Sequence, residues 1–348
     1  MKSAAMALVT LLALAVTIES ASASDPACQL RRYSSLDVNL DHGYPLIPVT
    51  AQQRDAWIVF DTTAVVPLIY ERYVHDYTSS TRKLASDSPG IHIGRFNVRE
   101  LGIIDDLRLG TARFRKGEFA IYEEEATERS ELPEVDGKPI IGRMSLTFFA
   151  NSDVEIDLAR HKINLYEATH CPDGAVVYWT NHYSEIPLKK GALGTYYFPM
   201  ELDGRRVEAT LTTTSQFSTL TTDVSRKLYD FDETSAGIEH RRTRGGTLSH
   251  YRSMSISTDS LHVSNTDILL MHSSVDCLLG KSAEGAAIHE ACYGGEAPLQ
   301  LGLPVIKKLH LYFATHDNKL YFTSAGDDQT NSPATGSSAP ASAPAQRP

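Results

Sequence analysis

The chain has 348 residues, of which 42% are hydrophobic and 22% are charged, and its formal net charge is −10. This length and composition are those of an ordinary globular protein with room for two compact domains. The acidic balance and the lack of a long basic stretch argue against nucleic acid as a partner.

The first 23 residues are typical of a secretory signal peptide. Lys2 precedes an apolar run, Ala4 to Val16, which is too short to span a bilayer comfortably, and Ala21-Ser22-Ala23 has the small-x-small form of a cleavage site. We therefore expect a secreted or periplasmic mature chain that begins at residue 24 and has no membrane span. An uncleaved anchor is the alternative.

Strand-like runs dominate the chain that follows. They are short, rich in β-branched and aromatic residues, and separated by turns containing Gly, Asp, Asn and Pro. The clearest strands are Ala56–Phe60, Asp106–Leu109, Phe119–Tyr122, Val154–Leu158 and Ile163–Tyr166. Only a few stretches predict helices, notably Leu68–Tyr77 and Thr222–Phe231. The pattern favours a mostly β protein with a few short helices.

The strand Ala56–Phe60 ends at a carboxylate, in the run Asp61-Thr62-Thr63-Ala64. A carboxylate at the end of a buried strand is costly unless it is hydrogen-bonded or used in chemistry. Asp61 is therefore a candidate catalytic acid. The alternative is an ordinary aspartate that makes a turn after the strand.

The second half of the chain repeats the first. Segment 207–231 aligns with segment 55–77, at an offset of 212 − 61 = 151 residues that places Thr212 on Asp61. Segments 252–271 and 301–322 then align with 105–122 and 140–166 in the same order. We read this as a duplicated β domain. The predicted boundaries are a first lobe at 24–166, a linker at 167–185, a second lobe at 186–323 and a disordered Ser/Ala/Pro-rich tail at 324–348.

Four cysteines lie outside the predicted signal peptide. An even number in an exported chain favours disulfides, and we expect Cys28–Cys171 and Cys277–Cys292, with free buried thiols as the alternative. No clustered Cys/His spacing is present, so we expect no metal and no cofactor.

The duplicated motif resembles the two-lobed aspartic peptidases of the retropepsin/pepsin class, over nearly the whole mature chain apart from the tail. In that family each lobe has a strand that ends in Asp-Thr/Ser-Gly, an apolar-apolar-Gly element near that Asp, and a β-hairpin flap. The first lobe has Asp61-Thr62-Thr63 and Ile140-Ile141-Gly142, followed by closing strands similar to those of bacterial secreted members. The second lobe has Thr212-Thr213-Thr214-Ser215 and Leu301-Gly302.

The resemblance implies an all-β fold of two similar closed, barrel-like lobes related by a pseudo-twofold axis. It implies that Thr62 and Thr213 join the lobes through hydroxyl–backbone hydrogen bonds. It also implies that Gly142 and Gly302 are equivalent, with a glycine in Val275–Lys281 as the alternative for the second.

Two departures from the family pattern bear on activity. The family mechanism uses two facing carboxylates that share one proton, and Thr212 can supply neither the acid nor the base. Neither Asp203 nor Asp223 reaches position 212 without a shifted alignment. Thr63 and Thr214 replace the family's glycine, which predicts either backbone strain or an extra hydroxyl donor for Asp61.

Three functions follow from this pattern. The first is an inactive aspartic-peptidase-like protein, expected to be a monomer, that binds an extended peptide or protein segment in the interlobe cleft. The second is an active acid endopeptidase that uses an Asp61-activated water. The third is an inhibitor or assembly module acting through surface loops, such as the arginine-containing Gly237–Tyr251 or the acidic Glu123–Gly137.

Overall fold

The computed structural model describes residues 30–85, 91–93, 96–123, 134–167, 176–191, 194–243, 246–258, 261–271 and 297–325. The predicted signal peptide, all four cysteines, the alternative glycine element at 275–281 and nearly all of the predicted tail lie outside these residues. Within the described part of the chain, no helix has the length and apolar character needed to cross a membrane.

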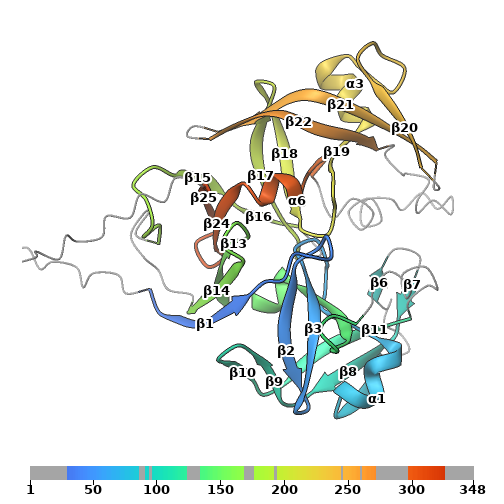
Figure 1. The fold of residues 1–348 in the computed structure, drawn as a ribbon, viewed down its shortest axis with the longest axis vertical. Coiled ribbons are helices and arrows are strands. Elements are labelled where there is room, and N and C mark those ends of the chain that lie inside the picture. Colours follow the sequence, from blue (N-terminus) through green and yellow to red (C-terminus); the bar gives the residue numbers. More distant parts are fainter. Residues whose placement is uncertain are drawn as a thin grey trace, which may run out of the picture.

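Strands build the structure, and the helices between them are short (Figure 1). The elements up to residue 167 are β1 (Arg32–Asp37), β2 (Leu46–Ala51), β3 (Arg54–Asp61), β4 (Leu68–Tyr70), η1 (Glu71–Tyr73), α1 (Val74–Tyr77), β5 (Ser80–Lys83), β6 (Ile91–Ile93), β7 (Phe96–Val98), β8 (Glu100–Ile104), β9 (Leu107–Leu109), β10 (Ala112–Phe114), β11 (Gly117–Tyr122), β12 (Ile140–Ser145), η2 (Leu146–Phe149), β13 (Ser152–Asp157) and β14 (Lys162–Glu167).

The remaining elements are β15 (Ser184–Pro187), β16 (Lys189–Lys190), β17 (Tyr196–Leu202), β18 (Arg205–Thr212), β19 (Ser218–Thr221), α3 (Thr222–Tyr229), β20 (Glu239–Thr243), β21 (Gly246–Ser257), β22 (His262–Met271), β23 (Leu299–Gly302), α6 (Leu303–Ile306), β24 (Leu309–Ala314) and β25 (Lys319–Ser324).

The two lobes have the same sheet topology. The first lobe contains the strand order β2-β3-β12-β4-β11-β8, and the second contains β17-β18-β23-β19-β22-β21. The parallel pairs also correspond, because β3–β12 and β4–β11 match β18–β23 and β19–β22. Strands β3 and β18 share the same eight-residue pattern of exposure. The predicted all-β duplication is thus confirmed.

A six-stranded antiparallel sheet joins the lobes, in the order β1-β14-β13-β24-β25-β15. Three of its strands come from each half of the chain, and β13 meets β24 at the centre, with Val154 opposite Phe313 and Ile156 opposite Leu311. These side chains are fully buried in one apolar cluster that continues into both lobes, through Phe60 and through Leu211. The shared core fixes the ends of β3 and β18 in one rigid body.

The predicted helix at Leu68–Tyr77 is wrong in its first three residues. Leu68–Tyr70 forms strand β4, which is buried throughout and hydrogen-bonded to β11 and β12, and only the following residues are helical. The apolar periodicity there reflects burial on both faces of a central strand. The second predicted helix is confirmed as α3, which ends where Asp230 adopts a left-handed conformation with φ of 57°.

Each lobe carries a hairpin at the corresponding place in its repeat. Strands β6 and β7 pair between Ile91 and Val98, and β20 pairs with β21 between Glu239 and His250. The sequence offset of 151 residues carries positions 91–98 onto 242–249, which fall within the second hairpin. Both hairpins lie toward the right-hand side of the molecule in Figure 1.

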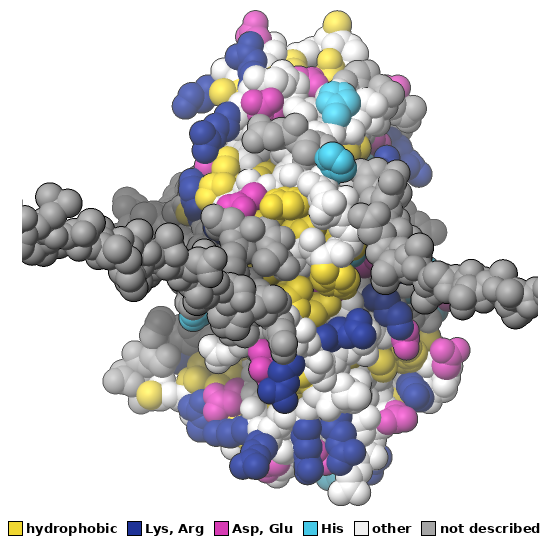
Figure 2. All heavy atoms as spheres, turned by 90° about the vertical axis from the view of Figure 1, so that its left-hand side faces the viewer, with side chains coloured by type: hydrophobic (Ala, Val, Ile, Leu, Met, Phe, Trp, Pro, Cys, Tyr) yellow, Lys and Arg dark blue, Asp and Glu magenta, His cyan; other side chains and the backbone are white. Residues whose placement is uncertain are grey.

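Figure 2 shows the opposite side, seen from the left of Figure 1. Lys and Arg side chains are spread over this face with Asp and Glu side chains among them, and hydrophobic side chains gather in its middle, between the two lobes.

Candidate functional site

The ends of β3 and β18 meet at the junction of the lobes through four reciprocal hydrogen bonds. The Thr62 hydroxyl donates to Leu211 O at 2.6 Å, and the Thr213 hydroxyl donates to Phe60 O at 2.6 Å. The Thr62 N–H donates to Thr213 Oγ1 at 3.1 Å, and the Thr213 N–H to Thr62 Oγ1 at 3.3 Å. These are hydrogen bonds of the kind that the resemblance implied. They place Asp61 and Thr212 at equivalent positions on either side of the pseudo-twofold axis.

Asp61 is buried, and three donors hold its carboxylate. The backbone N–H and the hydroxyl of Thr63 both donate to Oδ1, at 3.0 and 2.8 Å. Arg143 Nη1 donates to Oδ2 at 3.3 Å. The partners of this carboxylate within the described residues include no acidic side chain. Asp61 therefore forms a partly buried ion pair with Arg143 at the end of β3.

Thr63 adopts an unstrained backbone conformation. Neither Thr63 nor Thr214 is among the described residues with a positive φ. Of the two outcomes left open by the sequence, the extra hydroxyl donor is the one observed. Thr212 is also buried, with 4% of its surface exposed, and Thr214 is half-buried beside it.

The assumed equivalence of Gly142 and Gly302 is wrong. In the parallel pairs, Gly302 lies opposite Thr212, whereas Ser145 lies opposite Asp61. Gly302 is followed directly by α6 and Ser145 by η2, so Ser145 is the residue that corresponds to Gly302. Gly142 instead pairs with Ile69, three residues earlier in the strand.

Both glycines are nevertheless required by close backbone approach. A Cβ at Gly142 would lie 2.1 Å from Leu68 O, and a Cβ at Gly302 would lie 2.3 Å from Phe217 O. Neither distance leaves room for a side chain. The two glycines therefore allow β12 to pack closely against β4, and β23 against the segment that leads into β19.

Arg143 is the site residue that the sequence reasoning missed. It follows Gly142 in strand β12, which pairs in parallel with β3 and places Arg143 opposite Val59. Burial opposes the charge of its guanidinium, but Tyr70 and Asp61 outweigh this cost and raise the pKa of Arg143. An arginine within the otherwise apolar run Ile140–Met144 was a signal, because a cation in a buried strand needs a partner.

The two acids weighed as replacements for Thr212 lie elsewhere. Asp203 is in the turn before β18, where its carboxylate accepts the Ser255 N–H at 2.6 Å. Thr212 is at the opposite end of that eight-residue strand, roughly 25 Å away at the rise of an extended chain. Asp223 is in the first turn of α3, at the top of the second lobe in Figure 1. Neither acid belongs to the site.

The fold of this chain is similar to that of known proteins, although its sequence is not. No protein-family model matches the chain, and no curated protein matches its sequence. The structure is similar to an aspartic proteinase from Irpex lacteus, with a TM-score of 0.50 and 9% identity over 85% of this chain and 98% of that one. It is similar to the basic 7S globulin from soybean, with a TM-score of 0.50 and 9% identity over 86% of this chain and 98% of that one.

This chain has the pepsin-like aspartic proteinase fold. At 9% identity the likeness shows the fold alone. One neighbour is titled a proteinase and the other a seed globulin, so the pepsin-like fold does not by itself decide the chemistry of this site.

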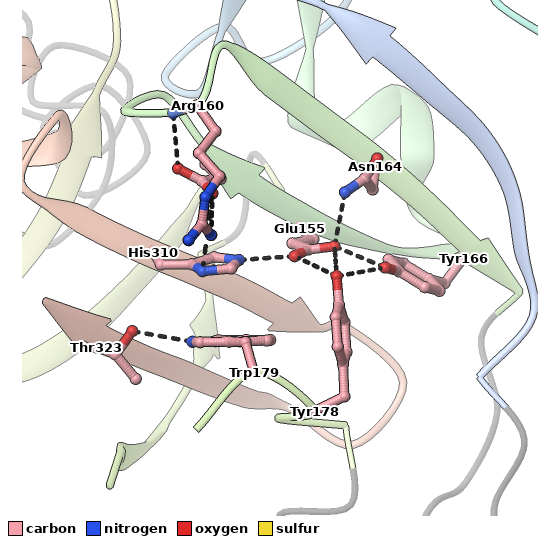
Figure 3. Close-up of polar contacts among 9 residues, drawn as sticks. Glu155, Arg160, Asn164, Tyr166, Tyr178, Trp179, His310 and Thr323 are labelled. Atoms are coloured by element: carbon pink, nitrogen blue, oxygen red, sulfur yellow. Dashed lines mark hydrogen bonds and ion pairs between the residues drawn. The ribbon is translucent and has the colours of Figure 1, made fainter. Parts of the chain in front are cut away.

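A second group of buried polar side chains lies on the outer face of the six-stranded sheet (Figure 3). Its centre is Glu155 on β13, which accepts hydrogen bonds from His310 Nε2 at 2.6 Å, Tyr166 at 2.6 Å, Tyr178 at 2.8 Å and Asn164 at 2.9 Å. Burial opposes the charge, but the hydrogen bonds from His310, Tyr166 and Asn164 outweigh it and lower the pKa of Glu155. The group joins both lobes and the chain between them.

Trp179 covers this group by stacking on the His310 ring at 3.9 Å between centroids, with its indole N–H bonded to Thr323. Asp153, on the same strand as Glu155, is 1% exposed and accepts the Thr315 N–H and the Tyr312 hydroxyl. Burial is the larger influence there and raises the pKa of Asp153 to about 6. With the outer face of the sheet filled in this way, Asp61 and its neighbours are the better candidate site.

Proposed function

We propose that this chain is a secreted protein of pepsin-like fold that binds an extended peptide or protein segment between its lobes and does not cleave it. The observation that carries the proposal is the state of Asp61: it lies across the pseudo-twofold axis from Thr212, and Thr63 and Arg143 hold its carboxylate. A degenerate second motif, Thr212-Thr213-Thr214, is thus combined with an intact scaffold.

The chemistry of peptide hydrolysis supports inactivity. The family mechanism needs one carboxylate to take a proton from water while a second, protonated carboxyl donates to the carbonyl oxygen. The Thr212 hydroxyl cannot act as the ionised base or as a carboxylic acid. Loss of one such partner lowers the rate by about 10²–10⁴, and by more where two groups act as a unit.

Peptide binding needs less than catalysis does. An extended segment binds through main-chain hydrogen bonds and side-chain pockets, which do not depend on a catalytic dyad. The hairpins β6–β7 and β20–β21 lie at the places where the family carries a flap or a cleft-edge loop. Both halves of the site belong to one chain, and the tethered second lobe has a higher effective concentration than a second copy, which favours a monomer.

Incubation with an unfolded protein substrate tests the absence of cleavage. We expect wild type to produce no fragments detectable by mass spectrometry at any pH from acid to neutral, and to match the Asp61→Asn variant. Fragments that appear at acid pH, are blocked by a pepstatin-type inhibitor and disappear in Asp61→Asn would overturn the proposal in favour of an acid endopeptidase.

Selection from a library of unstructured peptides tests binding. For a selected peptide we expect Arg143→Met to weaken the affinity at least about tenfold, or about 1.4 kcal/mol. Arg82→Met is the matched control, because Arg82 is also paired with a carboxylate, Glu118, but on the surface of the first lobe. Equal affinities in the two variants would place the binding surface away from the site and favour a surface-loop module.

A further inference from the structure

Arg143 connects the sheet of the first lobe to the Asp61 carboxylate. Its backbone belongs to β12, and its guanidinium reaches Asp61 Oδ2 at 3.3 Å. The Asp61 side chain is only 5% exposed, whereas that of Arg143 is 31% exposed. The pair is therefore buried at its acidic end and reachable from solvent at its basic end.

The charge at this site differs in kind from that of a working dyad. Two carboxylates close together share one proton because their repulsion prevents both from ionising. A guanidinium bonded to one carboxylate leaves that repulsion in place, but its attraction offsets the cost and favours the ionised form of both carboxylates. Tyr70 is the other ionisable group that faces Arg143 in the described structure, and it too favours the charged guanidinium.

We propose that Arg143 is a second, independent block on peptidase chemistry, so that restoring an aspartate at position 212 does not by itself restore a shared proton. This inference rests on the proposed loss of cleavage at the Asp61 site. Arg143 acts through Asp61 and is a positioning residue. With Arg143 in place, the two carboxylates and one guanidinium carry a net charge of −1 without any bound proton.

The consequence for hydrolysis follows from the proton balance. In a working dyad the ionised carboxylate accepts a proton from water as the water oxygen bonds to the carbonyl carbon, and the protonated carboxyl gives its proton to the carbonyl oxygen. The tetrahedral intermediate then loses the amine, which leaves with the proton taken from water, and the acid regains the other. If both carboxylates are ionised, the carbonyl oxygen has no donor.

Carboxyl-carbon NMR titration of variants tests the proposal. In Thr212→Asp we expect both carboxyls at the site to lose their protons in acid, so that the higher of the two apparent pKa values stays at or below about 4, the ordinary value of an aspartate. In Thr212→Asp combined with Arg143→Met we expect that higher apparent pKa to rise by about two units, because the guanidinium no longer offsets the repulsion between the two carboxylates. Arg82→Met in place of Arg143→Met should leave the titration of Thr212→Asp unchanged.

A higher apparent pKa already well above about 4 in Thr212→Asp would overturn the proposal, and so would the lack of a rise in the double variant. Thr212→Asn combined with Arg143→Met has the same shape without the second charge, and its amide spectrum checks that the double substitution folds. If that pair of changes unfolds the chain, Arg143→Gln replaces Arg143→Met with the same two criteria. Cleavage by wild type would refute the proposed function and with it the block, whereas a failed titration would refute the role of Arg143 and leave the proposed function standing.

Discussion

Four hydrogen bonds at Thr62 and Thr213 hold the candidate site together. Each hydroxyl donates to a backbone carbonyl of the opposite lobe and accepts that lobe's threonine N–H. Thr62 is 6% exposed and Thr213 is fully buried, so water cannot replace these bonds readily. The two residues therefore act as a coupled unit.

The coupling is measurable by a double-mutant cycle. We expect Thr62→Val and Thr213→Val each to lower the free energy of unfolding by about 1–3 kcal/mol, because each leaves buried backbone groups unpaired. The double variant should lose less than the sum, with an interaction of at least about 0.5 kcal/mol in urea unfolding. Thr210→Val is the control, since the Thr210 hydroxyl bonds to Tyr196 O within one lobe. If the cycle of Thr62→Val with Thr210→Val gives a similar interaction energy, the coupling between Thr62 and Thr213 is contradicted.

The raised pKa of Asp153 predicts that the protein loses stability as the pH rises. Its pKa is raised from 3.8 to about 6, chiefly by burial, so the folded state binds more protons than the unfolded state between these values. The stability linked to this group is complete below pH 3.8 and is lost as the pH rises through about 6. We expect Asp153→Asn to raise the free energy of unfolding by about 2 kcal/mol at neutral pH and to have little effect in acid.

Urea unfolding at acid and neutral pH checks this expectation, with the exposed Asp41→Asn as the control. A gain that does not change with pH would mean that packing around the amide, and not the charge of Asp153, is responsible.

At the scale of elements, the pairing of β13 with β24 is where the two lobes become one structure. Strand β13 alternates acids with apolar residues from Asp153 to Leu158, a pattern typical of a strand with one face in water. In the structure all three acids are buried and hydrogen-bonded, Glu155 to Tyr178, Asp153 to Thr315 and Asp157 to Arg160. Glu155 receives one of its two shortest bonds, at 2.6 Å, from His310 on the other lobe.

Glu155 should show the opposite pH dependence to Asp153. Its pKa is held below 4.5 by its donors, so its stabilisation is present above pH 4.5 and is lost as the pH falls through the folded value. We expect Glu155→Gln to cost about 3 kcal/mol at neutral pH, because an amide cannot accept from four donors, and to cost less in acid. Urea unfolding of Glu155→Gln and Asp153→Asn in the same buffers compares how the two substitutions change the free energy of unfolding at each pH. If both effects change with pH in the same direction, the opposite pKa shifts of Glu155 and Asp153 are refuted.

At the scale of the whole molecule, one buried apolar cluster extends through both lobes and the sheet between them. Neither lobe can separate without exposing part of that cluster and breaking the β13–β24 pair. The molecule should therefore unfold in one step.

The two tryptophans report separately on the unfolding of different parts of the molecule. Trp57 is in the first lobe, with its indole N–H bonded to Val135 O, and Trp179 covers the six-stranded sheet. We expect Trp57→Phe and Trp179→Phe, each with one tryptophan left, to give fluorescence transitions that coincide with their own circular dichroism transitions. Midpoints that differ between the two probes within one variant would show that a lobe unfolds alone.

Much of the fold was predictable because its signals are local. Short β-branched runs between turn residues predicted the strands, and a repeat offset of 151 residues predicted two equivalent lobes. The error at Leu68–Tyr70 arose because a strand buried on both faces has no alternation to distinguish it from a helix. Gly142 and Gly302 were misaligned because only the strand register shows that Ser145 is opposite Asp61.

The sequence by itself determined the duplicated β architecture and the positions of Asp61 and Thr212 at the ends of equivalent strands, whereas the hydrogen bonds of Thr62 and Thr213 between the lobes were expected from the family resemblance. Only the tertiary structure decided that Arg143 pairs with Asp61, 82 residues away, and that His310 pairs with Glu155, 155 residues away. The reason is physical. Strand content follows from neighbouring residues, but charge pairing across strands depends on sheet order and register, which the packing of the whole chain sets.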